Sequence, residues 1–294
     1  MLSVGIWGAA GYMGAPFSRA LLKAHRRGLL RFVILHRPES DLGRYPADIE
    51  KRRIDLDDGE VASATEEVRD LQVVISAVSW RAHESQYRLI DALKGSERLV
   101  TFFPSEYATP HTAEDLMSPD FTDSREKEKK EQAGAVLAAR RRNEGFNVNL
   151  SLLSFVSCYT FLCPRSKEFS GQALVYLLLH RLADLPNRSF SLVEISFGAR
   201  DLITLFTKLH HGQEPTIVKY TEEDYQRDLR RDYFGAMGAT SKKGVAVGAK
   251  WPEEIVSGFP GWQERTLEEY VKECLATEPL TFENRRESTD LSKD

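Results

Sequence analysis

The chain has 294 residues, of which 41% are hydrophobic and 29% charged, and its net charge is −4 at pH 7. This composition is ordinary for a folded globular protein, and the length allows one large domain or two smaller ones that share a core. A strong basic excess is absent, which argues against a nucleic-acid partner, and no apolar run approaches the roughly 18 residues of a transmembrane helix. We therefore expect a cytoplasmic protein that binds neither nucleic acid nor membrane.

Strand and helix patterns alternate along the first half of the chain. The predicted strands are Leu2–Trp7, Arg31–Leu35, Arg52–Leu56, Leu71–Val78, Leu99–Phe103 and Val148–Phe155. The predicted helices are Ala15–His25, Glu60–Arg69, Glu84–Lys94 and Lys127–Asn143. Strands that alternate with helices at this spacing require crossover connections, which produce a parallel sheet covered by helices on both faces. The sequence thus predicts an α/β fold built on a Rossmann-type, doubly wound parallel sheet.

The second half mixes helices with one strand. The predicted helices are Ala173–Leu182, Asp201–His210 and Thr266–Leu275, and the predicted strand is Ser189–Ser196. No linker rich in Pro, Gly or Ser separates the two halves. We therefore predict a Rossmann domain over residues 1–160, a smaller C-terminal α/β substrate lobe over 161–282 that packs on it, and a frayed tail over 283–294.

Three glycines, each separated by two residues, lie between the first predicted strand and the first predicted helix. In a dinucleotide-binding turn, the first glycine permits the tight turn, the second lets the backbone approach a diphosphate, and the third lets the helix pack on the strand. The start of the helix offers N–H groups and a positive dipole end to the phosphates. The residues predicted to contact the cofactor here are Gly8, Ala10, Gly11, Tyr12, Met13 and Gly14.

The end of the second predicted strand favours NADPH over NADH. NAD specificity usually needs an acidic residue at this point to bind the ribose 2′-OH. Here the strand runs into His36 and Arg37, and Glu39 and Asp41 come slightly later. The planar guanidinium of Arg37 suits a 2′-phosphate, because it can bond two oxygens at once. The alternative is that Arg37 is a solvated loop residue.

The ends of two further strands are predicted to line the same crevice, because ligands of doubly wound sheets bind at the carboxyl ends of strands. The residues expected there are Ser76, Ala77, Val78, Ser79, Phe103, Pro104 and Ser105. Trp80 follows directly and either covers the nicotinamide or packs. Glu106 needs a partner if it is buried, so we favour a role in holding its loop together over a role as an acid.

In sequence order, these pieces resemble the isoflavone reductase-like branch of the NmrA-like atypical short-chain dehydrogenases/reductases. The matching segments are GAAGYMG (8–14), LHRP (35–38), IDLDD (54–58), VVISAVS (73–79), the helix that follows it from Gln86 to Lys94, and FFPSEYA (102–108), with weaker ones at 195–206 and 265–275. Asp57, in the third segment, joins the cofactor-binding candidates. Two departures are Ala108, where the branch commonly has glycine, and the lack of an evident Tyr-x-x-x-Lys pair.

The resemblance implies an NADPH-dependent oxidoreductase of small, often aromatic molecules such as phenylpropanoids, or of polyketide-like products of secondary metabolism. Some NmrA-like proteins instead bind the nucleotide without known catalysis and act as redox-sensing regulators. A non-catalytic, NADP(H)-sensing regulatory protein is therefore the alternative function, since a shared fold does not choose between such roles.

The resemblance also implies a catalytic lysine at the start of the helix that follows FFPSEYA, where this chain has Lys127, Lys129 and Lys130. Lys130 precedes Ala133 and Leu137, on the predicted buried face, by three and seven residues, whereas Lys127 better fits the distance from the PSE motif. We favour Lys130 and keep Lys127 second. A third interpretation is a solvated helix start with no chemical role. A lysine beside the nicotinamide could pass a proton to the substrate or stabilise its oxyanion.

Residues that follow the sixth predicted strand should border the substrate. Phe155 and Tyr159 therefore join Trp80 and Glu106 as candidate substrate contacts. The three cysteines match no common zinc-binding spacing, and no metal site is expected. The expected ligands are NADPH/NADP⁺ and a small-molecule substrate, and the sequence leaves open whether the chain forms a homodimer.

Overall fold

The structure is a computed structural model in which residues 1–56, 61–79, 82–94, 96, 98–105, 107, 164–186, 188, 190–231, 254–276 and 291 are described. The predicted helix Lys127–Asn143 and the predicted strand Val148–Phe155 lie outside the described residues. So does the predicted domain boundary at residue 160, and the division into two domains therefore stays a prediction.

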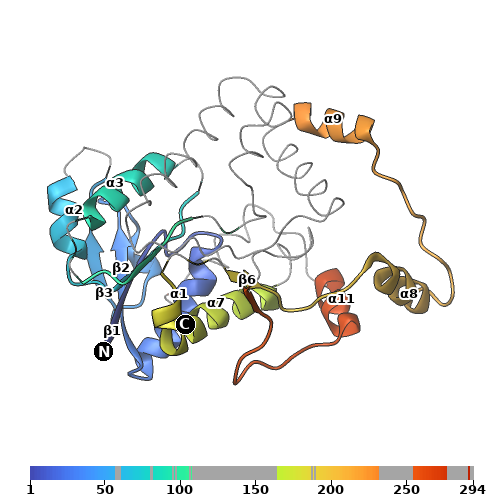
Figure 1. Cartoon of the computed structure of the whole chain (residues 1–294), viewed down its shortest axis with the longest axis horizontal. Coiled ribbons are helices and arrows are strands. Elements are labelled where there is room, and N and C mark those ends of the chain that lie inside the picture. The colour runs from blue at the N-terminus through green and yellow to red at the C-terminus, as the bar shows by residue number, and fades with distance from the viewer. Residues whose placement is uncertain are drawn as a thin grey trace.

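A parallel sheet of five strands forms the centre of the N-terminal part (Figure 1). The strands are β1 (Leu2–Trp7), β2 (Leu30–His36), β3 (Glu50–Arg53), β4 (Val73–Ser76) and β5 (Thr101–Phe103). Their order is β3-β2-β1-β4-β5, and every neighbouring pair is parallel. The chain builds outward from β1 to one edge and then returns to build the other side, so the strand order reverses between β1 and β4. The predicted α/β fold with a doubly wound parallel sheet is confirmed.

Helices cover both faces of this sheet, as the alternation of its side chains requires. Phe32 and Ile34 of β2 pack with α1 (Gly14–Arg26) and α7 (Pro164–His180) in one buried cluster. Val33 and Leu35 face the opposite way and pack with α2 (Val61–Val68) and α3 (His83–Leu93). Figure 1 shows the two pairs of helices on opposite sides of the strands. A strand buried on both faces explains why β2 reads as an unbroken apolar run.

Several predicted element bounds were wrong, including the end of the strand predicted over Ser189–Ser196, which is observed as Phe190–Leu192; the third strand and α7 are the most informative cases. The third strand begins at Glu50 and ends at Arg53, whereas the prediction ran from Arg52 to Leu56. Its charged side chains form ion pairs with neighbouring elements, and the buried residues Ile54 and Leu56 follow the strand instead of forming it. Helix α7 begins at Pro164, nine residues before the predicted start, because its first half packs on α1.

The later part of the described chain contains short elements, some of which the sequence did not predict. They are the 3-10 turn η3 (Leu182–Asp184), β6 (Phe190–Leu192), α8 (Ala199–Leu209), α9 (Glu222–Arg231), β7 (Glu254–Val256) and α11 (Leu267–Ala276). Another 3-10 turn, η1 (Leu42–Arg44), lies earlier, between β2 and β3. Strands β6 and β7 pair in parallel. The prediction lacked α9 and β7: α9 carries few apolar residues, and β7 has only three residues.

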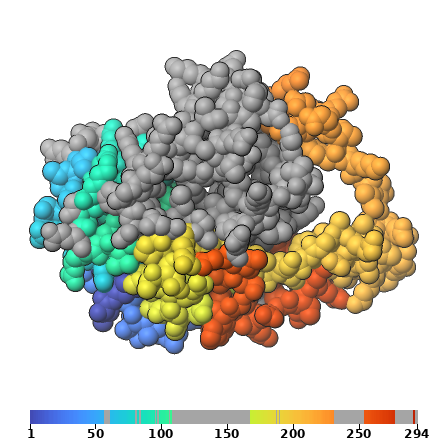
Figure 2. Space-filling model, viewed as in Figure 1, coloured from blue at the N-terminus to red at the C-terminus, as the bar shows by residue number. Residues whose placement is uncertain are grey.

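The segment after β7 packs on α7, and Figure 2 shows the two against each other. The ring of Phe169 lies 5.6 Å from that of Phe259 and 5.1 Å from that of Trp262, measured between centroids. Farther along, Leu205 of α8 packs with Tyr270 of α11. These contacts join the C-terminal elements to the helix that covers the sheet.

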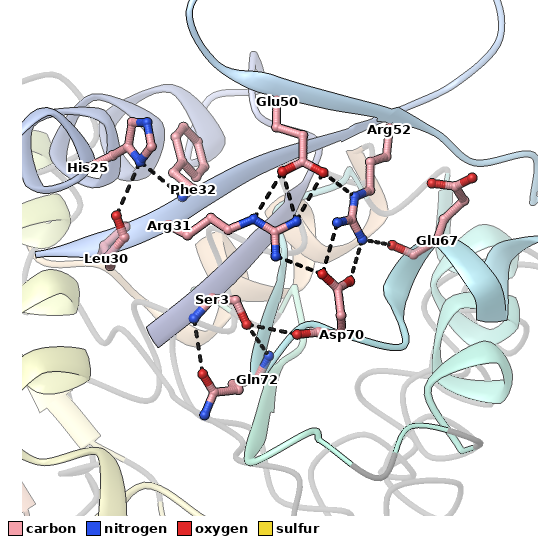
Figure 3. Close-up of polar contacts among 10 residues, drawn as sticks. All are labelled: Ser3, His25, Leu30, Arg31, Phe32, Glu50, Arg52, Glu67, Asp70 and Gln72. Carbon is pink, nitrogen blue, oxygen red and sulfur yellow. Dashed lines mark hydrogen bonds and ion pairs between the residues drawn. The ribbon is translucent and has the colours of Figure 1, made fainter. Parts of the chain in front are cut away.

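A cluster of ion pairs joins the strands at the amino end of the sheet, away from the carboxyl ends (Figure 3). Asp70 accepts from Arg52 at 2.5 Å and from Arg31 at 2.7 Å, and Glu50 accepts from each arginine at 2.8 Å. Hydrogen bonds from Arg52 and Arg31 hold the pKa of the Asp70 carboxyl far below its usual range. The side chain of Arg52 is only 13% exposed, so we assign the cluster a role in stabilising the edge of the sheet.

No helix among the residues that the structure describes combines the length and the apolar character needed to cross a membrane.

Candidate functional site

The glycine turn joins the carboxyl end of β1 to the start of α1. Gly8 has a φ of +88°, a left-handed conformation that glycine adopts without strain. The amide of Gly11 donates to the carbonyl oxygen of Gly8 at 2.9 Å, and the amide of Ala15 donates to that of Gly11 at 2.8 Å. The chain therefore reverses tightly and enters the helix with its backbone facing outward.

The turn leaves no space for side chains at its glycines. A Cβ atom on Gly14 would lie 2.0 Å from the carbonyl oxygen of Gly8, and one on Gly11 would lie 3.0 Å from that of Ala77. Ala77 directly follows β4, so the turn lies between the ends of β1 and β4, where the strand order reverses. In doubly wound sheets this is the position of the ligand crevice.

The start of α1 is suited to a negatively charged ligand. Its first turn contains no Asp or Glu, and Met13, which precedes the helix, provides no side-chain cap. The positive end of the helix dipole therefore faces the turn, and no acidic side chain in the first turn of α1 neutralises it. The bare backbone and this positive end fit a diphosphate.

Arg37 lies beside the turn, at the end of β2. Its guanidinium donates to the hydroxyl of Ser85 in α3 at 3.4 Å, and its Cζ lies 5.8 Å from the ring centroid of Trp7. Its backbone amide donates to Ser40 Oγ at 3.1 Å, and its carbonyl oxygen lies 2.8 Å from Nδ1 of the buried His36. These contacts hold a half-buried cation over the end of β1, at the same edge of the sheet as the glycine turn.

The loops after β4 and β5 are tied to each other by hydrogen bonds. Ser105 Oγ donates to the carbonyl oxygen of Val78 at 2.6 Å, and the Ser105 amide donates to Gln86 Oε1 at 2.8 Å. The buried Tyr107 hydroxyl donates to the carbonyl oxygen of Ser76 at 2.8 Å. These hydrogen bonds fix the ends of β4 and β5 to each other.

Most of the described residues that the sequence predicted for the site lie at one edge of the sheet. The structure brings together Gly8, Ala10, Gly11, Tyr12, Met13, Gly14, His36, Arg37, Ser76, Ala77, Val78, Ser79, Pro104 and Ser105 at the carboxyl ends of β1, β2, β4 and β5. Phe103 is only 1% exposed and packs in the core on the α1 and α7 side.

The remaining predicted site residues lie in parts of the chain that the structure does not describe. Asp57, Trp80, Glu106, Lys127, Lys130, Phe155 and Tyr159 lie outside the described residues. Within the described ranges, no group of three or more His, Cys, Asp or Glu side chains is arranged to hold a metal ion.

Sequence reasoning missed four residues that contact this site. Ser85 and Gln86 lie in the first turn of α3, and Tyr107 follows β5. Lys167 lies in α7 and contacts the ring of Tyr12 in the glycine turn. Gln86 and Tyr107 fall within or beside the segments that carried the resemblance, so their position was a usable signal. Lys167 had no local signal, because its contact depends on the packing of two helices distant in sequence.

Comparison with known proteins gives a clear result for structure and none for sequence. No family model matches the chain, and no curated protein matches its sequence. Among solved structures, the complex of leucoanthocyanidin reductase with NADPH from Vitis vinifera matches with a TM-score of 0.66 and 17% identity, over 93% of this chain and 99% of that one. An isoflavone reductase matches with a TM-score of 0.64 and 18% identity, over 92% and 98%.

A third match is AtPrR2 with NADP⁺ and (+)pinoresinol, with a TM-score of 0.65 and 15% identity, over 92% of this chain and 98% of that one. The chain shares the fold of these three proteins. The likeness covers nearly the full length of each, and it confirms the fold that the predicted resemblance implied. At these identities it establishes the fold alone.

Proposed function

We propose that the chain is an NADPH-dependent reductase that transfers hydride to a small organic metabolite, aromatic (phenylpropanoid-like) or polyketide-like. The observation that carries the proposal is the glycine turn at the reversal of strand order, with Arg37 fixed beside it. The similar fold of a leucoanthocyanidin reductase solved with NADPH supports it.

The described residues fit NADPH at two points. The turn from Gly8 to Gly14 would hold the diphosphate through backbone amides, and its close packing against the backbone of Gly8 and Ala77 depends on the absence of Cβ atoms at the glycines. Arg37 would bind the 2′-phosphate, with Ser85 and the Trp7 ring holding its guanidinium in place. The ends of β4 and β5 would then lie toward the nicotinamide. When bound, NADPH supplies the hydride.

The protein's own chemical contribution is assigned to a lysine. Lys130, with Lys127 as the second candidate, would donate a proton to the substrate oxygen or stabilise its negative charge. Trp80, Glu106, Phe155 and Tyr159 are the proposed substrate contacts, and the lobe over residues 161–282 would cover the substrate from the other side. The metabolites of the matched proteins, such as (+)pinoresinol, motivate the choice of an aromatic substrate class.

Calorimetric titration with NADPH, NADP⁺, NADH and NAD⁺ tests the proposal first. We expect clear preference for the two phosphorylated forms, followed by NADPH oxidation when phenylpropanoid and polyketide-like substrates are screened. Binding without turnover of any substrate would favour the NADP(H)-sensing regulatory function. Failure of all four nucleotides to bind would refute both functions.

A further inference from the structure

Helix α7 touches α1 closely because of a glycine. A Cβ atom on Gly171 would lie 2.4 Å from the carbonyl oxygen of Pro16 and 3.1 Å from the Cβ of Ala20. Pro16 lies in the first turn of α1 and Ala20 one turn later, so the glycine side of α7 faces the start of α1. Any larger residue at position 171 would push the two helices apart.

Lys167 lies four residues before Gly171 and therefore on the same side of α7, one turn toward its start. Its ammonium nitrogen lies 4.0 Å from the centroid of the Tyr12 ring. Tyr12 stands between Gly11 and Gly14, in the middle of the glycine turn. Both side chains are half-buried. The close contact of the helices thus brings a cation to the rim of the turn and rests it on an aromatic ring, an attractive arrangement.

The position of this cation matters because the ligand proposed for the turn, a diphosphate, is negatively charged. A dinucleotide diphosphate carries two negative charges, whereas backbone amides carry no net charge. Arg37 lies at the end of β2, where it is assigned to the 2′-phosphate and not to the diphosphate.

From this geometry we infer that Lys167 is a further cofactor-binding residue, which supplies the positive charge for the diphosphate of the bound dinucleotide. Tyr12 is its positioning residue, since the ring holds the ammonium at the rim of the turn. The inference rests on the proposed function, because it needs a dinucleotide at the glycine turn. It adds a charged group from the C-terminal side of the chain to a site otherwise built from the N-terminal strands.

The test compares Lys167→Met with wild type by calorimetric titration with NADPH and with NADH. NADPH and NADH contain the same diphosphate, and each would make the same charge-assisted contact with Lys167. We therefore expect Lys167→Met to lower the affinity for both nucleotides by the same factor, about tenfold. The loss should shrink as salt is raised, since ions screen a half-exposed charge. Lys23→Met is the matched control, because Lys23 is an exposed lysine in the last turn of α1 and the substitution removes the same charge.

Arg37→Met provides the contrast, because it should weaken NADPH and leave NADH unchanged. A Tyr12→Leu variant, alone and combined with Lys167→Met, tests the positioning role, and we expect the double variant to lose little more than Lys167→Met alone. If Lys167→Met binds both nucleotides as wild type does, or loses NADPH only, the inference is wrong while the proposed function stands. If wild type binds neither nucleotide, the proposed function itself fails.

Discussion

Replacing Gly14 by alanine tests whether the glycine turn binds the diphosphate through its backbone, which we call the cradle. The new Cβ atom would lie 2.0 Å from the carbonyl oxygen of Gly8 and 2.9 Å from its carbonyl carbon. The first distance is about 1.5 Å inside the separation at which such atoms normally touch. Because both neighbours are backbone atoms, no side-chain rotation relieves the overlap, and the turn between β1 and α1 must open.

An opening of this size would draw the amides of the turn away from the diphosphate. Loss of two charge-assisted hydrogen bonds at about 1.5 kcal/mol each corresponds to a rise of about 100-fold in the Kd for NADPH. The overpacking itself should lower the free energy of unfolding by about 1–3 kcal/mol. Calorimetric titration measures the first effect, and thermal unfolding without nucleotide measures the second.

Gly28→Ala is the matched control at the other end of α1. Gly28 has a φ of +71°, and a Cβ atom there would meet nothing within 4 Å. Alanine in this left-handed conformation should cost about 1–2 kcal/mol of stability, similar to the cost at Gly14, with no change in the Kd for NADPH. If Gly14→Ala binds NADPH as tightly as wild type, or if Gly28→Ala loses affinity to the same extent, the cradle argument is refuted.

Three further predictions concern single side chains. Arg37→Met should raise the Kd for NADPH by about 10- to 100-fold without affecting NADH, and equal losses for both nucleotides would contradict a 2′-phosphate role. Asp70→Asn should lower the free energy of unfolding by about 2 kcal/mol at pH 7, as measured by urea denaturation. The folded-state pKa of Asp70 is depressed, so the stabilisation that this carboxylate provides is complete above its unfolded pKa of about 4 and is lost progressively as the pH falls below that value. If the difference in unfolding free energy between Asp70→Asn and wild type persists unchanged at pH 2, the ion pairs are not its cause. Lys130→Ala should lower the turnover rate by about 100-fold or more while nucleotide binding stays intact, and Lys127→Ala should have little effect; if neither variant loses turnover, the proposed lysine chemistry is wrong.

The parts of the fold that were predicted correctly from the sequence are those that depend on interactions between residues close together in the chain. The glycine spacing at residues 8–14 specifies a tight turn into a helix, because each glycine's conformation or contact involves residues only a few positions away, or the strand beside them. The core strands β1, β2 and β4 are buried on both faces, so their apolar runs stood out from the polar helices between them. Arg37 could be singled out for the same reason, since its place at the end of β2 follows from the strand itself.

The remaining features depend on contacts between distant segments. The third strand was misplaced because its charged residues are paired by Arg31 and Asp70, which no local pattern reveals. Helix α7 was started too late because Gly171 weakens the helical pattern of its first half, while the same glycine permits the contact with α1 that secures it. That packing, and not any local signal, decided that Lys167 would lie on Tyr12 at the rim of the turn. The sequence by itself determined where the glycine turn and the strand ends lie, because these follow from neighbouring residues, whereas tertiary packing decided which side chains surround them.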